Sequence, residues 1–234
     1  MDHDSIAPGA LKTPVFTRLK GRRIVLASGS PRRTELLASV GIHPEVVPSM
    51  FEEDLPKSDF VGEAVYEYPV ANAGEKALEV YKRLVLENPA DPPELVIGAD
   101  TVVIADEQIL EKPRDKMDNL RMLADLSGKP CTVITGVAIV HPVLYNPGYK
   151  LRTVVEQTRL YFADIPAPLL QAYVDDGEGI DCAGGFAIQG KGALLVRGIE
   201  GDYNNVVGFP LFSVLTHLHE LIEDEELDLE GIGA

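Results

Sequence analysis

The stretch that most constrains the fold is LVIGADTVVIA (95–105), the most apolar strand-like run in the chain. Its composition predicts a buried strand, yet one carboxylate, Asp100, interrupts it. A buried carboxylate without a partner costs several kcal/mol. Asp100 is therefore expected either to emerge at the strand end or to have a partner, such as a divalent metal ion or a lysine. An Asp that bonds nearby backbone amides in a turn would give the same pattern.

Other apolar runs alternate with segments of helical periodicity, which predicts an α/β fold. A hairpin turn is expected at YNPGYK (145–150), so two strands are antiparallel, and we expect a mixed twisted sheet with flanking helices. Strands are expected over residues 22–27, 43–49, 95–105, 131–141 and 151–162, and helices over 31–40, 69–88, 116–127, 166–174 and 210–222. In the helix over 116–127, the spacing places Met117, Leu120, Leu123 and Ala124 on the buried face.

The segment SGSPRR (28–33) combines small residues, a predicted helix start and two arginines. Positive charge on the first turn opposes the helix dipole, at a cost of about 0.3–1 kcal/mol per arginine. A bound anion would reverse that sign, because amides at a helix N-terminus attract anions and arginine contacts phosphate bidentately. A capped helix with two solvated arginines is the alternative. The residues expected to hold a phosphate are Ser28, Ser30, Arg32 and Arg33.

The charge balance narrows the class of ligand. The chain has 234 residues and a formal net charge of −16, with much of the acid in ELIEDEELDLE (220–230). General nucleic-acid binders need a broad positive face, so we expect no nucleic-acid partner, and local Lys and Arg clusters favour a small anion. No apolar run approaches the roughly 20 residues of a membrane helix. The two cysteines, Cys131 and Cys182, are expected to be small core residues of a cytoplasmic protein.

Several shorter polar stretches are unremarkable when taken singly: FEED (51–54), EKA (75–77) and EKP (111–113). The glycine-rich segment GGFAIQGKG (184–192) could bring backbone and the Gln189 amide against a flat ligand. Other chemistries fit poorly, because the sequence has no H-E-x-x-H, C-x-x-C or G-x-G-x-x-G motif. Ser28 and Ser30 also have no evident histidine partner that could activate a serine nucleophile.

Taken in order, LASGSPRRTELL, EED, EKA, GADTVV, EKPRD, LSGK, IQGKGALLV and NNVVGFPL resemble the Maf family. The family is named for septum-formation inhibition, and its members are nucleoside triphosphate pyrophosphatases. The resemblance covers roughly residues 22–222 and is nearest to the branch acting on dTTP and UTP. It implies two lobes around a cleft, a fold related to the inosine triphosphate pyrophosphatases, and often a homodimer.

The same resemblance implies roles for individual residues. It assigns Asp100 as the proton acceptor. From these positions we expect Asp100 to help deprotonate the attacking water, and Asp100 and Glu53 to bind Mg²⁺ or Mn²⁺ directly or through water. Glu53, Lys76 and Lys112 match the charged catalytic positions. The positions tied to substrate choice are Arg32, Thr101 and Gln189. One departure is Cys182, which stands where a lysine is frequent in the family.

Three parts of the chain are expected: a flexible extension over residues 1–20, a pyrophosphatase domain over 21–222 and an acidic tail over 223–234. Two alternatives stay open. The first is the same reaction on 7-methyl-GTP or on a modified pyrimidine nucleotide. The second is a non-catalytic nucleotide sensor acting in cell division.

Overall fold

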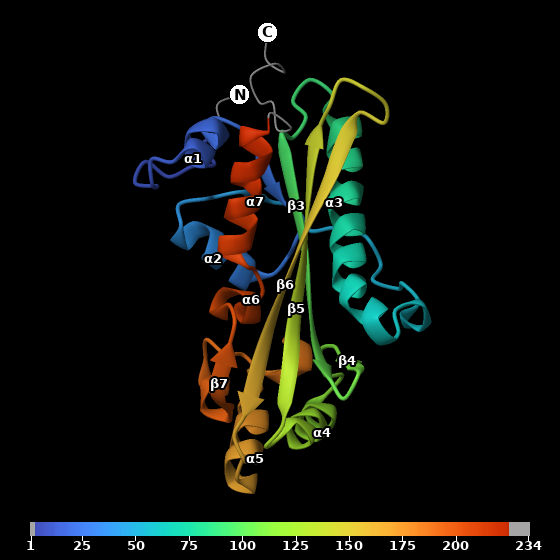
Figure 1. The fold of residues 1–234 in the computed structure, drawn as a ribbon, viewed down its shortest axis with the longest axis vertical. Helices are drawn as coiled ribbons and strands as arrows, with labels where there is room; N and C mark the ends of the chain where they lie inside the picture. The colour runs from blue at the N-terminus through green and yellow to red at the C-terminus, as the bar shows by residue number, and fades with distance from the viewer. Residues whose placement is uncertain (1–2, 225–234) are drawn as a thin grey trace.

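In the computed structural model, which describes residues 3–224, seven strands form one mixed sheet (Figure 1). The order is β2-β1-β3-β5-β6-β7, and β4 pairs with β3. β1 is parallel to β2 and β3, and the other pairs are antiparallel. The mixed α/β fold is thereby confirmed. The strands are β1 (Ile24–Leu26), β2 (Glu45–Val46), β3 (Leu95–Ala105), β4 (Gln108–Leu110), β5 (Pro130–Pro142), β6 (Tyr149–Phe162) and β7 (Val196–Glu200).

Helices cover both faces of this sheet. The α-helices are α1 (Pro14–Leu19), α2 (Pro31–Ser39), α3 (Tyr68–Glu87), α4 (Lys116–Leu126), α5 (Ala167–Asp176), α6 (Tyr203–Val207) and α7 (Leu211–Glu223). Short 3-10 helices are η1 (Lys57–Asp59), η2 (Gly62–Glu67), η3 (Ala183–Gly185) and η4 (Lys191–Leu195). Among the described residues, no helix is both long and apolar enough to cross a membrane.

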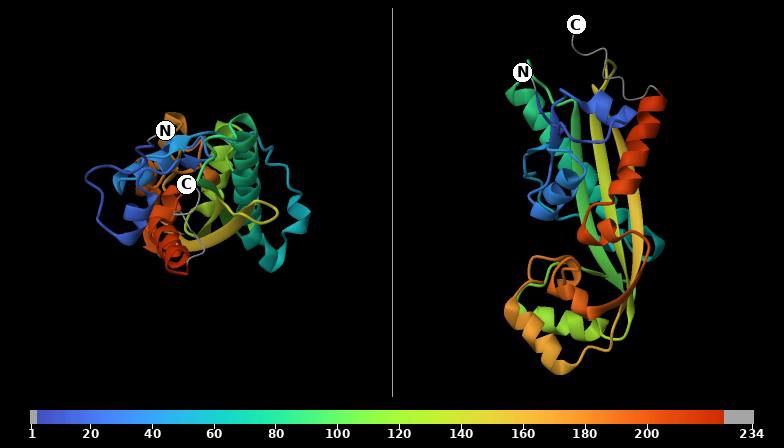
Figure 2. Two further views of the ribbon diagram at one scale, coloured as in Figure 1. Left: turned by 90° about the horizontal axis from the view of Figure 1, so that it is seen from above. Right: turned by 90° about the vertical axis from the view of Figure 1, so that its left-hand side faces the viewer.

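The alternation of side chains along β3 separates two hydrophobic clusters in the first lobe. Val96 packs with α3 on one face, whereas Leu95 and Ile97 pack with α1, α2 and α7 on the other (Figures 1 and 2). A further cluster forms a second lobe, where the far ends of the long strands meet α4 and α5. Figure 2 shows this lobe below the first, joined to it by β3, β5 and β6. The predicted two-lobed arrangement is therefore present.

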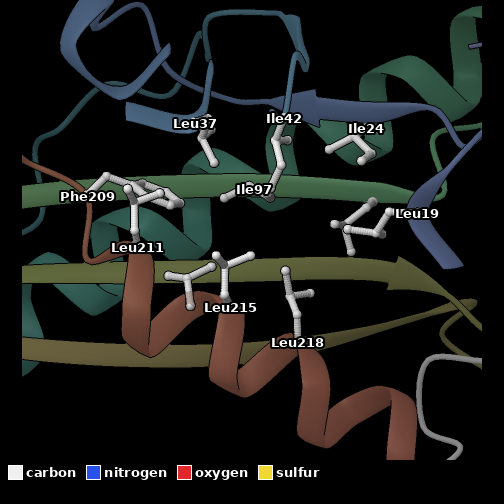
Figure 3. A pocket seen from close by; sticks show the side chains of 11 residues that line it. Leu19, Ile24, Leu37, Ile42, Ile97, Phe209, Leu211, Leu215 and Leu218 are labelled. Carbon is white, nitrogen blue, oxygen red and sulfur yellow. The ribbon is translucent and has the colours of Figure 1, made fainter. Parts of the chain in front are cut away.

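The core of the first lobe is tightly packed between α7 and the sheet. Leu215 and Leu218 of α7 lie against Ile97 of β3, and Leu37 of α2 approaches from the opposite side (Figure 3). The residual cavity between these side chains has a volume of only about 10 Å³, so the packing leaves no room for a ligand.

Residues 3–20, which we expected to be a flexible extension, pack against this first lobe. Ile6, Val15, Phe16 and Leu19 are buried in the same cluster as α7. Thr13 caps α1 by accepting a hydrogen bond from the backbone N–H of Phe16. At the other end of the chain, residues 225–234 of the expected acidic tail lie outside the described residues.

One predicted helix face is only half right: Leu123 is fully buried and Leu120 packs against the same cluster, but the other two predicted residues are exposed. Met117 of α4 is 79% exposed, and Ala124 is exposed as well. The buried face instead carries Asp118 and Asn119 together with Met122, because these polar side chains bind neighbouring groups. Asp118 pairs with two nearby arginines, and the Asn119 amide donates to the backbone carbonyl of Gly185, the last residue of η3. β4, β7, α1 and α6 are short elements that the sequence pattern did not indicate.

Candidate active site

A cleft with a volume of about 940 Å³ lies between the two lobes. Its walls come from the loop after β1, the middle of β3, α3 and the glycine-rich segment after α5. Every candidate residue from the sequence lines it: Ser28, Ser30, Arg32, Arg33, Glu53, Lys76, Asp100, Thr101, Lys112 and Gln189. Positive and negative side chains that are far apart in the sequence therefore share one concave surface.

Asp100 reaches the cleft because β3 changes partners along its length. β3 pairs with β1 over residues 95–97 and with β4 over residues 103–105. Asp100 falls between these pairings, directly beside the loop that leaves the carboxyl end of β1. Ligand sites in α/β folds gather at such strand ends. The expectation that Asp100 emerges at a strand end is therefore partly right. β3 itself continues past Asp100, but the neighbouring strand β1 ends before it.

The carboxylate of Asp100 has two partners on α3. Lys76 Nζ lies 2.9 Å from Asp100 Oδ1, and the Asn72 amide donates to Asp100 Oδ2 at 3.1 Å. Lys76 Nζ also lies 2.9 Å from Oε1 of the exposed Glu53. Asp100 and Lys76 are only 8% and 7% exposed, so each charge depends on the other for compensation. The ammonium group thus holds two carboxylates at one point of the cleft.

Two glycines bring α3 close enough for these contacts. A Cβ on Gly98 would lie 2.3 Å from the carbonyl oxygen of Ala73. A Cβ on Gly136 would lie 2.6 Å from the carbonyl oxygen of Pro69. Both distances are far below van der Waals contact, so the helix can press onto β3 and β5 only because neither residue has a side chain.

Arg33 is fixed in the wall of the cleft by three hydrogen bonds. It donates to Ser28 Oγ at 2.8 Å, to Thr101 Oγ1 at 3.1 Å and to the carbonyl of Gly208 at 3.0 Å. Burial lowers the pKa of the Arg33 guanidinium, and the nearby Asp100 carboxylate opposes that shift. The guanidinium stays cationic at neutral pH, because the ordinary arginine pKa is far above 7. None of its three acceptors is a carboxylate, so the guanidinium forms no direct ion pair there, and the Asp100 carboxylate compensates its charge only through space.

Arg32 reaches across the cleft to the second lobe. Its guanidinium donates to the carbonyl of Asp181 at 3.0 Å and to Cys182 Sγ at 3.2 Å. Cys182 is therefore a buried thiol beside a candidate substrate residue, and burial raises its pKa. Both cysteines are free and buried, as expected.

Comparison with known proteins agrees with this geometry. A family model described as Maf-like protein matches residues 23–221. The chain belongs to the Maf family. It is 47% identical over 202 residues to a Homo sapiens protein named probable bifunctional dTTP/UTP pyrophosphatase/methyltransferase protein, covering 85% of this chain and 32% of that protein. The chain thus spans about a third of the human protein's length.

Two other Maf relatives are matched over most of their length. A Schizosaccharomyces pombe protein named dTTP/UTP pyrophosphatase is 42% identical over 224 residues, covering 93% of this chain and 91% of the relative. A Geobacter metallireducens protein of the same name is 42% identical over 199 residues, covering 85% and 96%.

The acidic pair of this Maf chain suits a hard divalent ion that also binds substrate. Among residues 3–224, no group of three or more His, Cys, Asp or Glu side chains could hold a metal alone. Glu53 and Asp100 nevertheless converge on one cation, the Lys76 ammonium. Mg²⁺ is usually bound by one or two carboxylates together with waters and substrate phosphates. The two residues therefore fit a metal that the nucleotide brings with it.

Sequence reasoning missed one buried polar residue of this site. Asn72 is fully buried, and its Oδ1 has no hydrogen-bond partner in the described structure. Asn72 lies one helical turn before Lys76 and so shares its helix face. This spacing could have identified Asn72 from the sequence. The remaining candidates differ in their contacts. Ser30 precedes α2 as expected but makes no side-chain capping bond, and Lys112 and Gln189 are exposed in the cleft wall.

Proposed function

We propose that this chain hydrolyses dTTP and UTP to the monophosphate and pyrophosphate. One observation carries the proposal: the arginines at the start of α2 and the carboxylate pair around Lys76 line the same cleft. The triphosphate of the substrate needs positive charge around it, whereas the attacking water needs a carboxylate that can accept its proton. This cleft contains both kinds of group. The names of the yeast and bacterial relatives support the same substrates.

The arginines are suited to bind the triphosphate. Arg33 is held rigidly by three neutral acceptors, so little side-chain entropy is lost when a phosphate binds. Arg32 and Lys112 add positive charge from other parts of the cleft wall. Together they would stabilise the charge that grows on the leaving pyrophosphate, as preorganised cations do in phosphoryl transfer.

Asp100 is the proposed general base. A water oxygen attacks the α-phosphorus, the bond to the bridging oxygen of pyrophosphate breaks, and Asp100 takes the proton of the water. Lys76 and Asn72 bind the two oxygens of this carboxylate and so fix its orientation. Lys76 also neutralises one of the two negative charges of Glu53 and Asp100, which keeps both carboxylates at one point.

A divalent ion completes this proposal. Glu53 and Asp100 would hold Mg²⁺ or Mn²⁺ together with phosphate oxygens, and the ion would supply charge neutralisation and a lower pKa of water. The expected result of removing it is specific: EDTA abolishes turnover, and added Mg²⁺ or Mn²⁺ restores it. Turnover that is unchanged in EDTA would remove the metal from the proposal.

Gln189 and Thr101 are the proposed residues of substrate choice. Gln189 is exposed at the cleft wall, so its amide is free to pair with the edge of a base. The deciding experiment incubates the purified chain with all common nucleoside triphosphates, 7-methyl-GTP and modified pyrimidine nucleotides, and measures pyrophosphate and monophosphate. We expect the highest kcat/KM for dTTP and UTP. Release of single phosphates would contradict the reaction, and preference for 7-methyl-GTP would contradict the substrate.

The same panel separates an enzyme from a nucleotide sensor, which would bind without turnover. We further propose that the enzyme works in the cytoplasm, a reducing compartment that suits the free thiols of Cys131 and Cys182. A homodimer is the expected assembly, and sedimentation of the purified chain would test it.

A further inference from the structure

One carboxylate in the cleft wall has no part in the proposed reaction. Glu178 lies two residues after the end of α5, is half-buried, and lines the same cleft as Gln189. Its surroundings show what it binds.

Both oxygens of Glu178 accept hydrogen bonds from the segment that carries Gln189. Oε1 accepts from the backbone N–H of Lys191 at 2.9 Å, and Oε2 accepts from the backbone N–H of Gly192 at 2.9 Å. These are charge-assisted bonds, which are stronger than bonds between neutral groups. The carboxylate therefore holds the backbone two and three residues after Gln189.

The segment itself is a tight turn that is also held at its start. The backbone N–H of Ala187 donates to the Tyr173 hydroxyl at 3.0 Å, and that of Gly190 donates to the Ala187 carbonyl at 3.1 Å. A Cβ on Gly190 would lie 2.1 Å from Glu178 Oε1, so the backbone passes directly against the carboxylate. Gln189 thus stands on a turn fixed on both sides by residues at the end of α5.

The other end of the Glu178 turn contacts Arg32. The Cys182 thiol donates to the Glu178 carbonyl at 3.6 Å, and Arg32 donates to Cys182 Sγ and to the Asp181 carbonyl. One short turn, residues 178–182, therefore touches both the segment with Gln189 and a candidate phosphate residue.

We infer that Glu178 is a positioning residue for base recognition: its carboxylate fixes the position and orientation of Gln189 in the cleft. The inference rests on the proposed function, because it takes Gln189 as the residue that pairs with the pyrimidine edge. A displacement of about 1 Å in a positioning group can cost on the order of a hundredfold in rate. Because Gln189 is proposed to contact the base and not the reacting phosphorus, loss of the clamp should reduce discrimination between bases more than it reduces hydrolysis itself.

The test compares Glu178→Gln with Asp176→Asn. Glutamine keeps one acceptor oxygen but turns an NH₂ group toward a backbone N–H, so one clamp bond is lost. Asp176 also contacts the segment, but only through an ion pair with the exposed Lys191 side chain. We expect Glu178→Gln to lower the ratio of kcat/KM for UTP over CTP about tenfold, Asp176→Asn to leave it unchanged, and Glu178→Asp to recover part of it.

A double-mutant cycle separates positioning from general damage to the fold. If Glu178 acts through Gln189, Glu178→Gln should change the base ratio very little in a Gln189→Ala background. An equal loss of turnover on every nucleotide, with an unchanged ratio, would overturn the inference. If Glu178→Gln fails to fold, Gly190→Ala displaces the same carboxylate from the other side, and the same ratio is measured. A wild-type chain that releases no pyrophosphate would instead refute the proposed function.

Discussion

Replacing Lys76 by methionine should destabilise the fold as well as stop the reaction. The ammonium group contacts Asp100 Oδ1 and Glu53 Oε1, each at 2.9 Å. Methionine fills a similar volume but carries no charge. Asp100 would then keep only the Asn72 amide as a partner while remaining almost wholly buried.

The size of the effect follows from this burial. Removing one partner of a buried ion pair costs about 3–5 kcal/mol, because the other charge is left uncompensated. The Asp100 side chain opens onto the cleft and retains one hydrogen bond, so we take the lower end, about 3 kcal/mol. With an m-value of about 3 kcal/mol/M for a chain of this size, the urea midpoint should fall by about 1 M.

Urea unfolding at pH 7, followed by circular dichroism, measures this midpoint. The matched control is Lys82→Met on the exposed side of the same helix, where we expect a change within about 1 kcal/mol. The double variant Lys76→Met, Asp100→Asn should recover much of the lost stability, since neither charge remains. A Lys76→Met midpoint equal to that of the wild type would refute the buried pair.

Four further results are expected. Asn72→Leu removes the donor to Asp100 Oδ2 and should lower kcat about tenfold with KM nearly unchanged; steady-state kinetics with an equal rise in KM would contradict this. Arg33→Lys cannot span three acceptors, so KM should rise about tenfold, and an unchanged KM would argue against phosphate contact. Burial raises the pKa of Cys131 to about 12, so a thiol reagent at pH 8 should modify it only in urea. Because the unfolded thiol ionises near pH 8.5, its contribution to stability is lost as the pH rises from about 8.5 to 12, and Cys131→Ala should reduce that loss in urea titrations across this range.

The sequence was most informative where hydrophobic pattern and chemistry coincided. The expected strand over 95–105 matches β3, because an apolar run of that length is compatible with few other structures. The unfavourable position of Arg32 and Arg33 at a helix start predicted an anion site; both residues line the cleft, and their contact with phosphate stays a prediction. Asp100 was expected to have a partner, but lysine and metal were equally compatible with the sequence. Only the approach of α3, which Gly98 permits, identifies Lys76 as a partner.

Contacts that depend on tertiary packing left little trace in the sequence. Met117 fits an apolar helix face, yet it is exposed, whereas Asp118 and Asn119 are buried beside it and bind nearby arginines and the Gly185 carbonyl. Glu178 is one of four acids in VDDGEGID (174–181), and acids in such a polar stretch are usually solvated. Its function as a clamp depends on two backbone amides thirteen and fourteen residues later, which no local pattern reveals.

The central claim is that water attacks the α-phosphorus of a nucleotide held between the arginines and Asp100. Hydrolysis of UTP in water enriched with ¹⁸O tests it directly, with mass spectrometry of both products. We predict that the label enters the monophosphate and that the pyrophosphate carries none. Label in the pyrophosphate, or release of inorganic phosphate with a diphosphate product, would contradict the account.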